Sequence, residues 1–339
     1  MAADILRSGG LVALPTETVY GLGASALDED AVKRIFAVKG RPQDNPLIIH
    51  VAGPEALAEW CEDVPEEAYA ITERFWPGPL TLVLRCRKTG EPHIPDRVTA
   101  GLDTVAVRCP DHPATLAVIR LAGVPVAAPS ANLSGKPSTT TALHCLHDLE
   151  GKVEAVLDGG PCRVGLESTI LDLTVSPPRI LRPGGVTPEQ LREVLGEVEL
   201  DPGLVRPEET PKAPGMKYRH YSPAAEVTLI KCESAGEFRK YASEVPDERT
   251  AVLCWTGEEA LFPGKRVLAY GRGDAPETLA ANVFAALREL DTPEIRRILV
   301  RCPEEAGVGL AVVNRLKKAA GGRILLLSSL PALGRCGEK

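Results

Sequence analysis

Apolar runs and their spacing predict two α/β regions along this chain. In the first region, short apolar runs are typical of buried strands, and the run 11–14 stops at Pro15. A helix is predicted after Asp28, because apolar side chains recur at helical spacing as far as Gly40, which can end a helix in the left-handed conformation. Many short strands with few helices between them favour a large, twisted, mixed sheet. The further strands are predicted at 47–51, 80–84, 105–108, 124–128, 169–173 and 179–182.

The pattern changes near residue 200. The stretch 201–223 contains five prolines and neither a helical nor a strand period, so we interpret it as a linker or a functional loop. After it, strands and helices alternate, which is typical of a small Rossmann-like domain. We therefore expect an α/β domain over 1–200, a linker over 201–225 and a Rossmann-like domain over 226–339. The predicted strands of the last domain are 227–230, 251–255, 267–270 and 298–301, and its helices are 277–290 and 312–320.

Composition and charge narrow the possible classes of protein. Of the 339 residues, 44% are hydrophobic and 25% charged, which is ordinary for a globular chain and excludes general disorder. The net charge of −7 argues against a broad nucleic-acid-binding surface. We find no apolar run of membrane-spanning length and no signal-peptide pattern. The nine cysteines form no C-x-x-C pair, which favours free thiols in a reducing cytoplasm over a zinc site.

Two glycine motifs resemble nucleotide-binding loops only superficially. The segment 21–26 fits G-x-G-x-x-A, but six residues separate it from the preceding strand, where a dinucleotide site needs a tight turn. Gly135 and Lys136 are followed by Pro137, so they do not form a Walker A loop. A bound nucleotide would therefore be held by other groups.

Polar side chains gather at the ends of the predicted strands, where α/β proteins bind ligands. The segment 15–23 is a polar loop that ends in two glycines, which would let the backbone approach a ligand, although a plain turn also explains it. Lys39 and Arg41 stand two apart before Asn45 and could hold one anion such as a triphosphate, or form a solvated helix end. His50, inside an apolar strand, is either a ligand contact or a core histidine.

Hydrogen-bond donors dominate the remaining strand ends. Arg108 ends an alternating strand and could bind a carboxylate through both nitrogens. Ser130 and Asn132 follow another strand, and Ser168 and Arg182 complete the set. No nucleophile–base pair is apparent, so catalysis would rest on positioning and electrostatic stabilisation. From the residues alone, the prediction stops at a protein that binds a nucleotide and a small carboxylate.

These segments together resemble the YrdC-like family, and the whole chain resembles the two-domain form of that family. The resemblance implies a YrdC-like twisted mixed sheet followed by a smaller Rossmann-like α/β domain. The motifs that carry it are 15–23, Lys39-x-Arg41 with Asn45, Pro46 and His50, Ser130-x-Asn132, Ser168-Thr169, Arg182, 220–223 and 307–316.

The resemblance also implies an activity and its partners. The expected reaction is the synthesis of L-threonylcarbamoyladenylate and pyrophosphate from L-threonine, bicarbonate and ATP, with Mg²⁺ arriving on ATP and no metal site of the protein's own. A separate transferase complex would use the product to form N6-threonylcarbamoyladenosine at position 37 of tRNA, so tRNA is an indirect partner. Two alternatives are an RNA-binding module of the same fold and a carbamoyl transferase of hydrogenase maturation. The second alternative would need zinc fingers that this sequence does not contain.

Each site residue receives its expected role from the same resemblance. Lys39 and Arg41 are the expected catalytic residues, and His220 with Tyr221 is expected to fold over the mouth of the site. The ATP contacts are expected at Lys39, Arg41, Asn45, Thr104, Ser130, Asn132, Ser138, Arg182 and Tyr221. The L-threonine contacts are expected at Thr18, His50, Arg108, Ala128 and Ser168.

Overall fold

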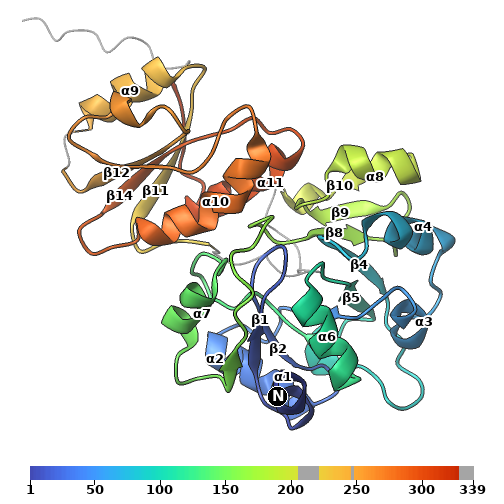
Figure 1. Cartoon of the computed structure of the whole chain (residues 1–339). Coiled ribbons are helices and arrows are strands. Elements are labelled where there is room, and N and C mark those ends of the chain that lie inside the picture. Colours follow the sequence, from blue (N-terminus) through green and yellow to red (C-terminus); the bar gives the residue numbers. More distant parts are fainter. Residues whose placement is uncertain (205–220, 246–247, 328–339) are drawn as a thin grey trace, which may run out of the picture.

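The computed structural model describes residues 1–204, 221–245 and 248–327, which form two sheets with helices around them (Figure 1). The larger sheet belongs to the first part of the chain. Its strands are β1 (Val12–Leu14), β2 (Gly21–Ser25), β3 (Ile48–His50), β4 (Leu80–Arg85), β5 (Thr104–Arg108), β6 (Val126–Ala127), β7 (Ala155–Val156), β8 (Thr169–Asp172), β9 (Arg179–Arg182) and β10 (Glu199–Leu200). The helices of this part are α1 (Ala2–Arg7), α2 (Glu29–Lys39), α3 (Ala56–Trp60), α4 (Glu66–Phe75), α5 (Asp96–Thr99), α6 (Pro113–Ala122), α7 (Ala142–Leu149) and α8 (Pro188–Leu195).

The larger sheet mixes parallel and antiparallel pairs in the order β10-β9-β8-β4-β5-β3-β6-β2-β1-β7. The strands β3 and β5 are parallel and place His50 opposite Arg108. The strand β4 runs antiparallel to β5 and places Thr81 opposite Arg108. Paired residues point to the same face of a sheet, so these three side chains share one face. This arrangement confirms the predicted large mixed sheet.

The strand β9 carries a β-bulge beside the face that holds His50, Arg108 and Thr81, which we call the functional face. Ile170 of β8 lies opposite Arg182, while Leu171 lies opposite Ile180, so Leu181 is the extra residue of β9. Leu181 packs in a small apolar cluster with Ile48, Val83, Ala106 and Ile170.

The predicted helix after Asp28 is confirmed as α2. The Asp28 carboxylate accepts a hydrogen bond from the Ala31 amide at 3.0 Å, and Gly40 ends the helix with φ of 61°. Lys39 is therefore the last helical residue, and the helix end directs it toward the loop that follows β6. The predicted strands of this part are also present, shifted by one or two residues at their ends.

Two expectations about the first part of the chain are wrong. Helices are numerous rather than few, because several are short segments that depend on packing and caps, such as α6 with Pro113 in its first turn and Gly123 after its end. The last three residues of the predicted polar loop 15–23 belong to the strand β2, which continues to Ser25. Gly23 is needed there, since a Cβ atom would lie 2.9 Å from Cγ1 of Val126.

The second sheet is parallel throughout and confirms the predicted small α/β fold. Its order is β13-β12-β14-β11-β15, so β14 lies between β12 and β11, where a Rossmann sheet has its first two strands side by side. The helix α9 covers one face, and α10 and α11 cover the face turned toward the larger sheet (Figure 1). The elements are β11 (Glu226–Lys231), α9 (Ala235–Glu244), β12 (Thr250–Cys254), β13 (Arg266–Ala269), α10 (Pro276–Glu289), β14 (Arg297–Arg301), α11 (Val308–Ala319) and β15 (Ile324–Leu326).

The described cysteines are free thiols, and seven of the eight are buried. Cys336 lies outside the described residues. Within the described ranges, no cluster of three or more His, Cys, Asp or Glu side chains has a metal-binding arrangement. No helix in those ranges has both the length and the apolar character needed to cross a membrane.

Candidate functional site

One cleft on the functional face of the larger sheet collects most of the predicted site residues. Its empty space, counted together with the solvent at its open mouth, is about 620 Å³. Its lining includes nine predicted site residues: Arg41, His50, Arg108, Ala128, Ser130, Asn132, Ser168, Arg182 and Tyr221. It also includes Thr16, Val19, Gly21, Ile48, Pro129 and Glu167.

A row of polar side chains crosses four strands along the cleft. Thr81 on β4 lies opposite Arg108 on β5, and its hydroxyl oxygen lies 2.7 Å from that of Ser168. The Ser168 hydroxyl accepts a hydrogen bond from Arg182 Nη2 at 3.1 Å, and the Ser168 carbonyl accepts one from Arg182 Nε at 3.0 Å. Arg182 is buried, and burial lowers its pKa to about 10. The row therefore has a buried guanidinium group at each end and two hydrogen-bonded hydroxyls between them.

Arg108 is already paired inside the protein. Its Nη2 donates to Oε1 of Glu17 at 2.7 Å, and both side chains are at most 5% exposed. Glu17 also accepts a hydrogen bond from the Asp111 amide at 3.0 Å. The sequence analysis did not single out Glu17, although it lies within the polar segment 15–23. The sequence feature that could have identified Glu17 is a carboxylate between two threonines in a segment that precedes a buried strand.

His50 is a neutral imidazole beside Arg108. Burial and then the positive charge of Arg108 lower the pKa of His50 to about 3. Its Nδ1 atom is buried and makes no hydrogen bond to the described residues. A neutral ring nitrogen without a partner, facing a cleft, is suited to exchange a hydrogen bond with a ligand.

Arg41 lines the cleft, whereas the predicted contact Asn45 does not, although Arg41 binds its carbonyl. Arg41 Nη2 donates to the Pro46 carbonyl at 2.9 Å, and Arg41 also contacts the Asn45 carbonyl at 3.3 Å. The side-chain oxygen of Asn45 is buried and has no hydrogen-bond donor among the described residues. The same is true of the side-chain oxygen of Asn132. These two buried acceptors can each take a donor from a ligand or water.

Lys39 does not line the cleft but binds the backbone of the loop 130–138. Its Nζ donates to the carbonyls of Ser130 and Asn132, and the side chain is buried. Burial, followed by the nearby charge of Arg41, lowers the pKa of Lys39 to about 7. The Ser134 amide returns a hydrogen bond to the Lys39 carbonyl at 2.8 Å. Lys39 is thus tied to the two residues that line the cleft, Ser130 and Asn132.

Three other predicted contacts lie outside the lining. The Thr18 hydroxyl oxygen is buried 2.8 Å from that of Thr16, which does line the cleft. The Ser138 hydroxyl donates to Glu167, another lining residue. Thr104 shares the functional face of β5 with Arg108 but begins the strand that Arg108 ends, about 13 Å away at the usual rise per residue.

Tyr221 brings the second part of the chain to the cleft. It is buried with φ of 63°, and its ring lies 5.1 Å from that of Phe284 on α10. The Arg315 guanidinium of α11 lies 5.8 Å from the Tyr221 ring and pairs with Glu167 at 2.7 Å. Burial favours a higher pKa for Glu167, but Arg315 and Arg182 outweigh it and lower that pKa. His220 lies outside the described residues.

The fold and the cleft define a class of protein: a two-part α/β protein whose cleft is lined by arginines and hydroxyls, groups suited to anionic ligands. The described residues contain no apparent nucleophile–base pair. The Sua5, yciO and yrdC family model, described as Telomere recombination, matches residues 4–184. A second model, described as Threonylcarbamoyl-AMP synthase, C-terminal domain, matches residues 186–321. The chain belongs to this family, in its two-domain form.

Relatives of known name support the same assignment. The chain is 48% identical to the threonylcarbamoyl-AMP synthase of Pyrococcus abyssi, over 96% of this chain and 94% of the relative. It is 46% identical to the enzyme of that name from Bacillus subtilis, over 96% and 93%. The crystal structure of P. abyssi Sua5 complexed with L-threonine superposes with a TM-score of 0.90, over 96% of this chain and 94% of that one.

A shorter relative matches only the first part of the chain. The Pseudomonas aeruginosa threonylcarbamoyl-AMP synthase is 36% identical over 54% of this chain, which is 95% of its own length. The same name is therefore given to proteins with and without a counterpart of the second sheet.

Proposed function

We propose that this chain is an L-threonylcarbamoyladenylate synthase, a nucleotidyltransferase that converts L-threonine, bicarbonate and ATP to threonylcarbamoyl-AMP, pyrophosphate and water. The observation that best supports this proposal is one cleft that contains Arg108 beside the neutral His50, together with further cationic side chains. The chain also belongs to a family of this activity. The amine of threonine adds to the carbon of bicarbonate with loss of water. The carbamate oxygen then displaces pyrophosphate from the α-phosphorus of ATP.

We assign the threonine end to His50 on β3, Arg108 on β5 and Ser168, which immediately precedes β8. Arg108 Nη2 is held by Glu17, which leaves Nη1 to meet the carboxylate of threonine. The unpartnered Nδ1 of His50 is suited to the threonine hydroxyl. A site that hydrogen-bonds this hydroxyl rejects analogues without it far better than an apolar pocket does. Thr18, Ala128 and Ser168 complete the proposed threonine contacts.

We assign the ATP end to the opposite side of the cleft. Arg41 and Arg182 supply positive charge where the phosphates would lie, and their fixed hydrogen bonds pre-orient them for the charge that develops during transfer. Lys39 would support this end through its hydrogen bonds to the carbonyls of Ser130 and Asn132. The other proposed ATP contacts are Asn45, Thr104, Ser130, Asn132, Ser138 and Tyr221, of which Asn45, Thr104 and Ser138 do not line the cleft.

We propose that Mg²⁺ enters on the phosphates of ATP. The carboxylates beside the cleft, Glu17 and Glu167, are each paired with an arginine, which leaves neither as a simple metal ligand. The metal would neutralise phosphate charge, while the protein side chains orient the reactants.

The product would be used elsewhere. A threonylcarbamoyl adenylate is an activated mixed anhydride, so we propose that a separate transferase consumes it to modify tRNA, and that tRNA does not contact this chain during synthesis. The linker over 201–225 and its closing role, the division at 200 and 226, and a cytoplasmic location stay predictions. Of the proposed closing pair, only Tyr221 is described, and it lines the cleft.

The decisive experiment measures pyrophosphate release from ATP with L-threonine and bicarbonate each added or omitted. We expect release only when both are present, and a mass corresponding to threonylcarbamoyl-AMP in the product. Arg41→Ala should abolish release in a folded protein. Binding of ATP without release under any condition would favour an RNA-binding module instead, and RNA binding by gel shift would then be the next measurement.

A further inference from the structure

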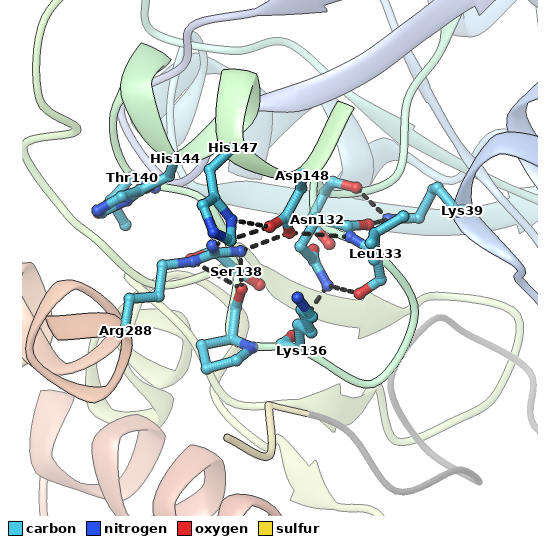
Figure 2. A network of polar contacts seen from close by, with 12 residues as sticks. Lys39, Asn132, Leu133, Lys136, Ser138, Thr140, His144, His147, Asp148 and Arg288 are labelled. Carbon is cyan, nitrogen blue, oxygen red and sulfur yellow. Dashed lines mark hydrogen bonds and ion pairs between the residues drawn. The ribbon is translucent and has the colours of Figure 1, made fainter. Parts of the chain in front are cut away.

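We propose that Arg288 and Arg315 of the second part of the chain are positioning residues for the site, because they hold the loop 130–138 in its working shape. This inference rests on the proposed function, since it names side chains that support the same cleft. The loop contributes Ser130 and Asn132 to the lining. Its outer side faces α10 and α11 (Figure 2).

Arg288 binds the C-terminal end of the loop 130–138. Its Nε donates to the carbonyls of Pro137 and Ser138 at 3.1 and 3.2 Å, and its Nη2 donates to Pro137 at 2.6 Å. The same guanidinium meets both carboxylate oxygens of Asp148 on α7, at 2.8 and 3.2 Å (Figure 2). One side chain of α10 therefore joins two segments of the first part of the chain.

Asp148 carries the connection back to the near end of the loop. Its carboxylate accepts a hydrogen bond from the Leu133 amide at 3.1 Å. Burial favours a higher pKa for Asp148, but Arg288, His147 and the Leu133 amide outweigh it and lower the pKa to about 2. Between these two anchors, the Asn132 amide group donates to the carbonyls of Leu133 and Lys136. The loop is thus fixed on both sides of its turn.

Arg315 reaches the same loop by a second route. It pairs with Glu167, and Glu167 accepts the hydroxyl hydrogen of Ser138. Arg315 also donates to the Pro183 carbonyl at 2.8 Å, next to Arg182 in the chain. Ser222 adds a third contact, since its amide donates to the Gly135 carbonyl at 2.8 Å.

The contacts point to positioning rather than chemistry. Neither Arg288 nor Arg315 lines the cleft. Arg288 pairs with Asp148, and Arg315 pairs with Glu167, so each acts on the loop through a carboxylate of the first part of the chain. The P. aeruginosa relative matches 54% of this chain, which is 95% of its own length, so a protein with that name can lack a counterpart of much of this chain. In this chain the loop is held from outside, and small displacements of positioned groups cost large factors in rate.

The test compares Arg288→Ala with Arg266→Ala in the full chain. Arg266 pairs with Glu289 of the same helix α10, but at the exposed surface, so it is a matched control. We expect Arg288→Ala to raise KM for ATP and to lower kcat/KM about tenfold or more, while Arg266→Ala stays near wild type. Hydrogen exchange should quicken at the amides of Leu133 and Ser134 and stay unchanged in β11 and β14.

Two further variants keep the test decisive if Arg288→Ala folds poorly. Arg288→Lys retains the charge but not the forked contact, and Asp148→Asn retains an acceptor for the Leu133 amide; both should give intermediate losses. Arg315→Lys should slow catalysis in the same direction. Unchanged kinetics and unchanged loop exchange in Arg288→Ala would overturn the proposal. A wild-type protein without pyrophosphate release would overturn the proposed function instead, and loop exchange would still report whether Arg288 holds the loop.

Discussion

Glu17 and Arg108 form a buried ion pair with 2.7 Å between Oε1 and Nη2, at the base of the cleft. The pair sets the direction of the guanidinium, since Glu17 takes one nitrogen and the Gly78 carbonyl accepts from Nε at 3.3 Å. These two contacts use Nε and Nη2, which leaves Nη1 for the proposed threonine carboxylate. Glu17, a charged residue that would ordinarily be expected at the surface, is therefore a buried part of the site.

Removing Glu17 should therefore destabilise the protein strongly. Glu17→Ala leaves a buried guanidinium without its partner, and we expect the free energy of unfolding to fall by about 3–5 kcal/mol. The measurement is urea denaturation. Arg163→Ala breaks the exposed pair with Asp111 and serves as the control, with an expected loss of about 0–1 kcal/mol. Equal losses in the two variants would contradict the structural role of Glu17.

The low pKa of His50 predicts how stability responds to acid. The folded protein keeps His50 neutral down to about pH 3, whereas the unfolded chain takes up a proton near pH 6.5. Unfolding therefore binds a proton in this window, and stability falls as the pH drops below 6.5, by up to about 1.4 kcal/mol per pH unit. Urea denaturation at pH 7 and pH 5 should show a smaller loss in His50→Gln. The same loss in both proteins would mean that His50 titrates normally.

Lys39 predicts proton uptake when ATP binds. Its pKa is about 7 in the ligand-free protein, because it is buried and lies near Arg41. Phosphates nearby would favour the charged form, so at pH 8 binding should take up a proton, and at pH 6 this uptake should vanish. Titration calorimetry in buffers of different ionisation enthalpy measures the uptake. Lys39→Arg keeps its charge at both pH values and should show none; uptake equal to wild type in that variant would assign the proton to another group.

Gly23 on β2 predicts a packing cost within the larger sheet. A Cβ atom there would lie 2.9 Å from Val126 and 3.0 Å from Leu14, so Gly23→Ala should cost about 1–3 kcal/mol in unfolding free energy. Gly236→Ala on α9 is the control, because the nearest atom to its Cβ is 3.7 Å away and alanine favours a helix. A neutral Gly23→Ala would mean that neighbouring strands adjust freely.

The sequence predicted the strands that are continuous apolar runs, because a strand buried on both faces leaves that pattern. It did not predict β2, since Gly21 and Gly23 have low strand propensity and are retained for close packing. The short helices were also missed, because their stability comes from tertiary contacts and caps rather than from a long period.

The sequence prediction named more of the donors around the cleft than of the acceptors. Arginines and hydroxyls were recognised because they suit anions, and nine of the predicted residues line the cleft. Glu17 and Glu167 were missed because carboxylates were sought as acid–base pairs and not as partners of buried arginines. Arg288 could not be found either, since its role depends on a contact across 151 positions of sequence, to Pro137.

The bulge at Leu181 makes the site depend on the length of a strand as well as on its residues. With one residue fewer in β9, regular alternation would return. Deleting Leu181 would leave Arg182 opposite Ile170 on the same face, but it would remove from the apolar cluster the leucine that packs beside the arginine. Among homologues, the number of residues in this strand should therefore be informative about the packing around the arginine as well as about the arginine itself.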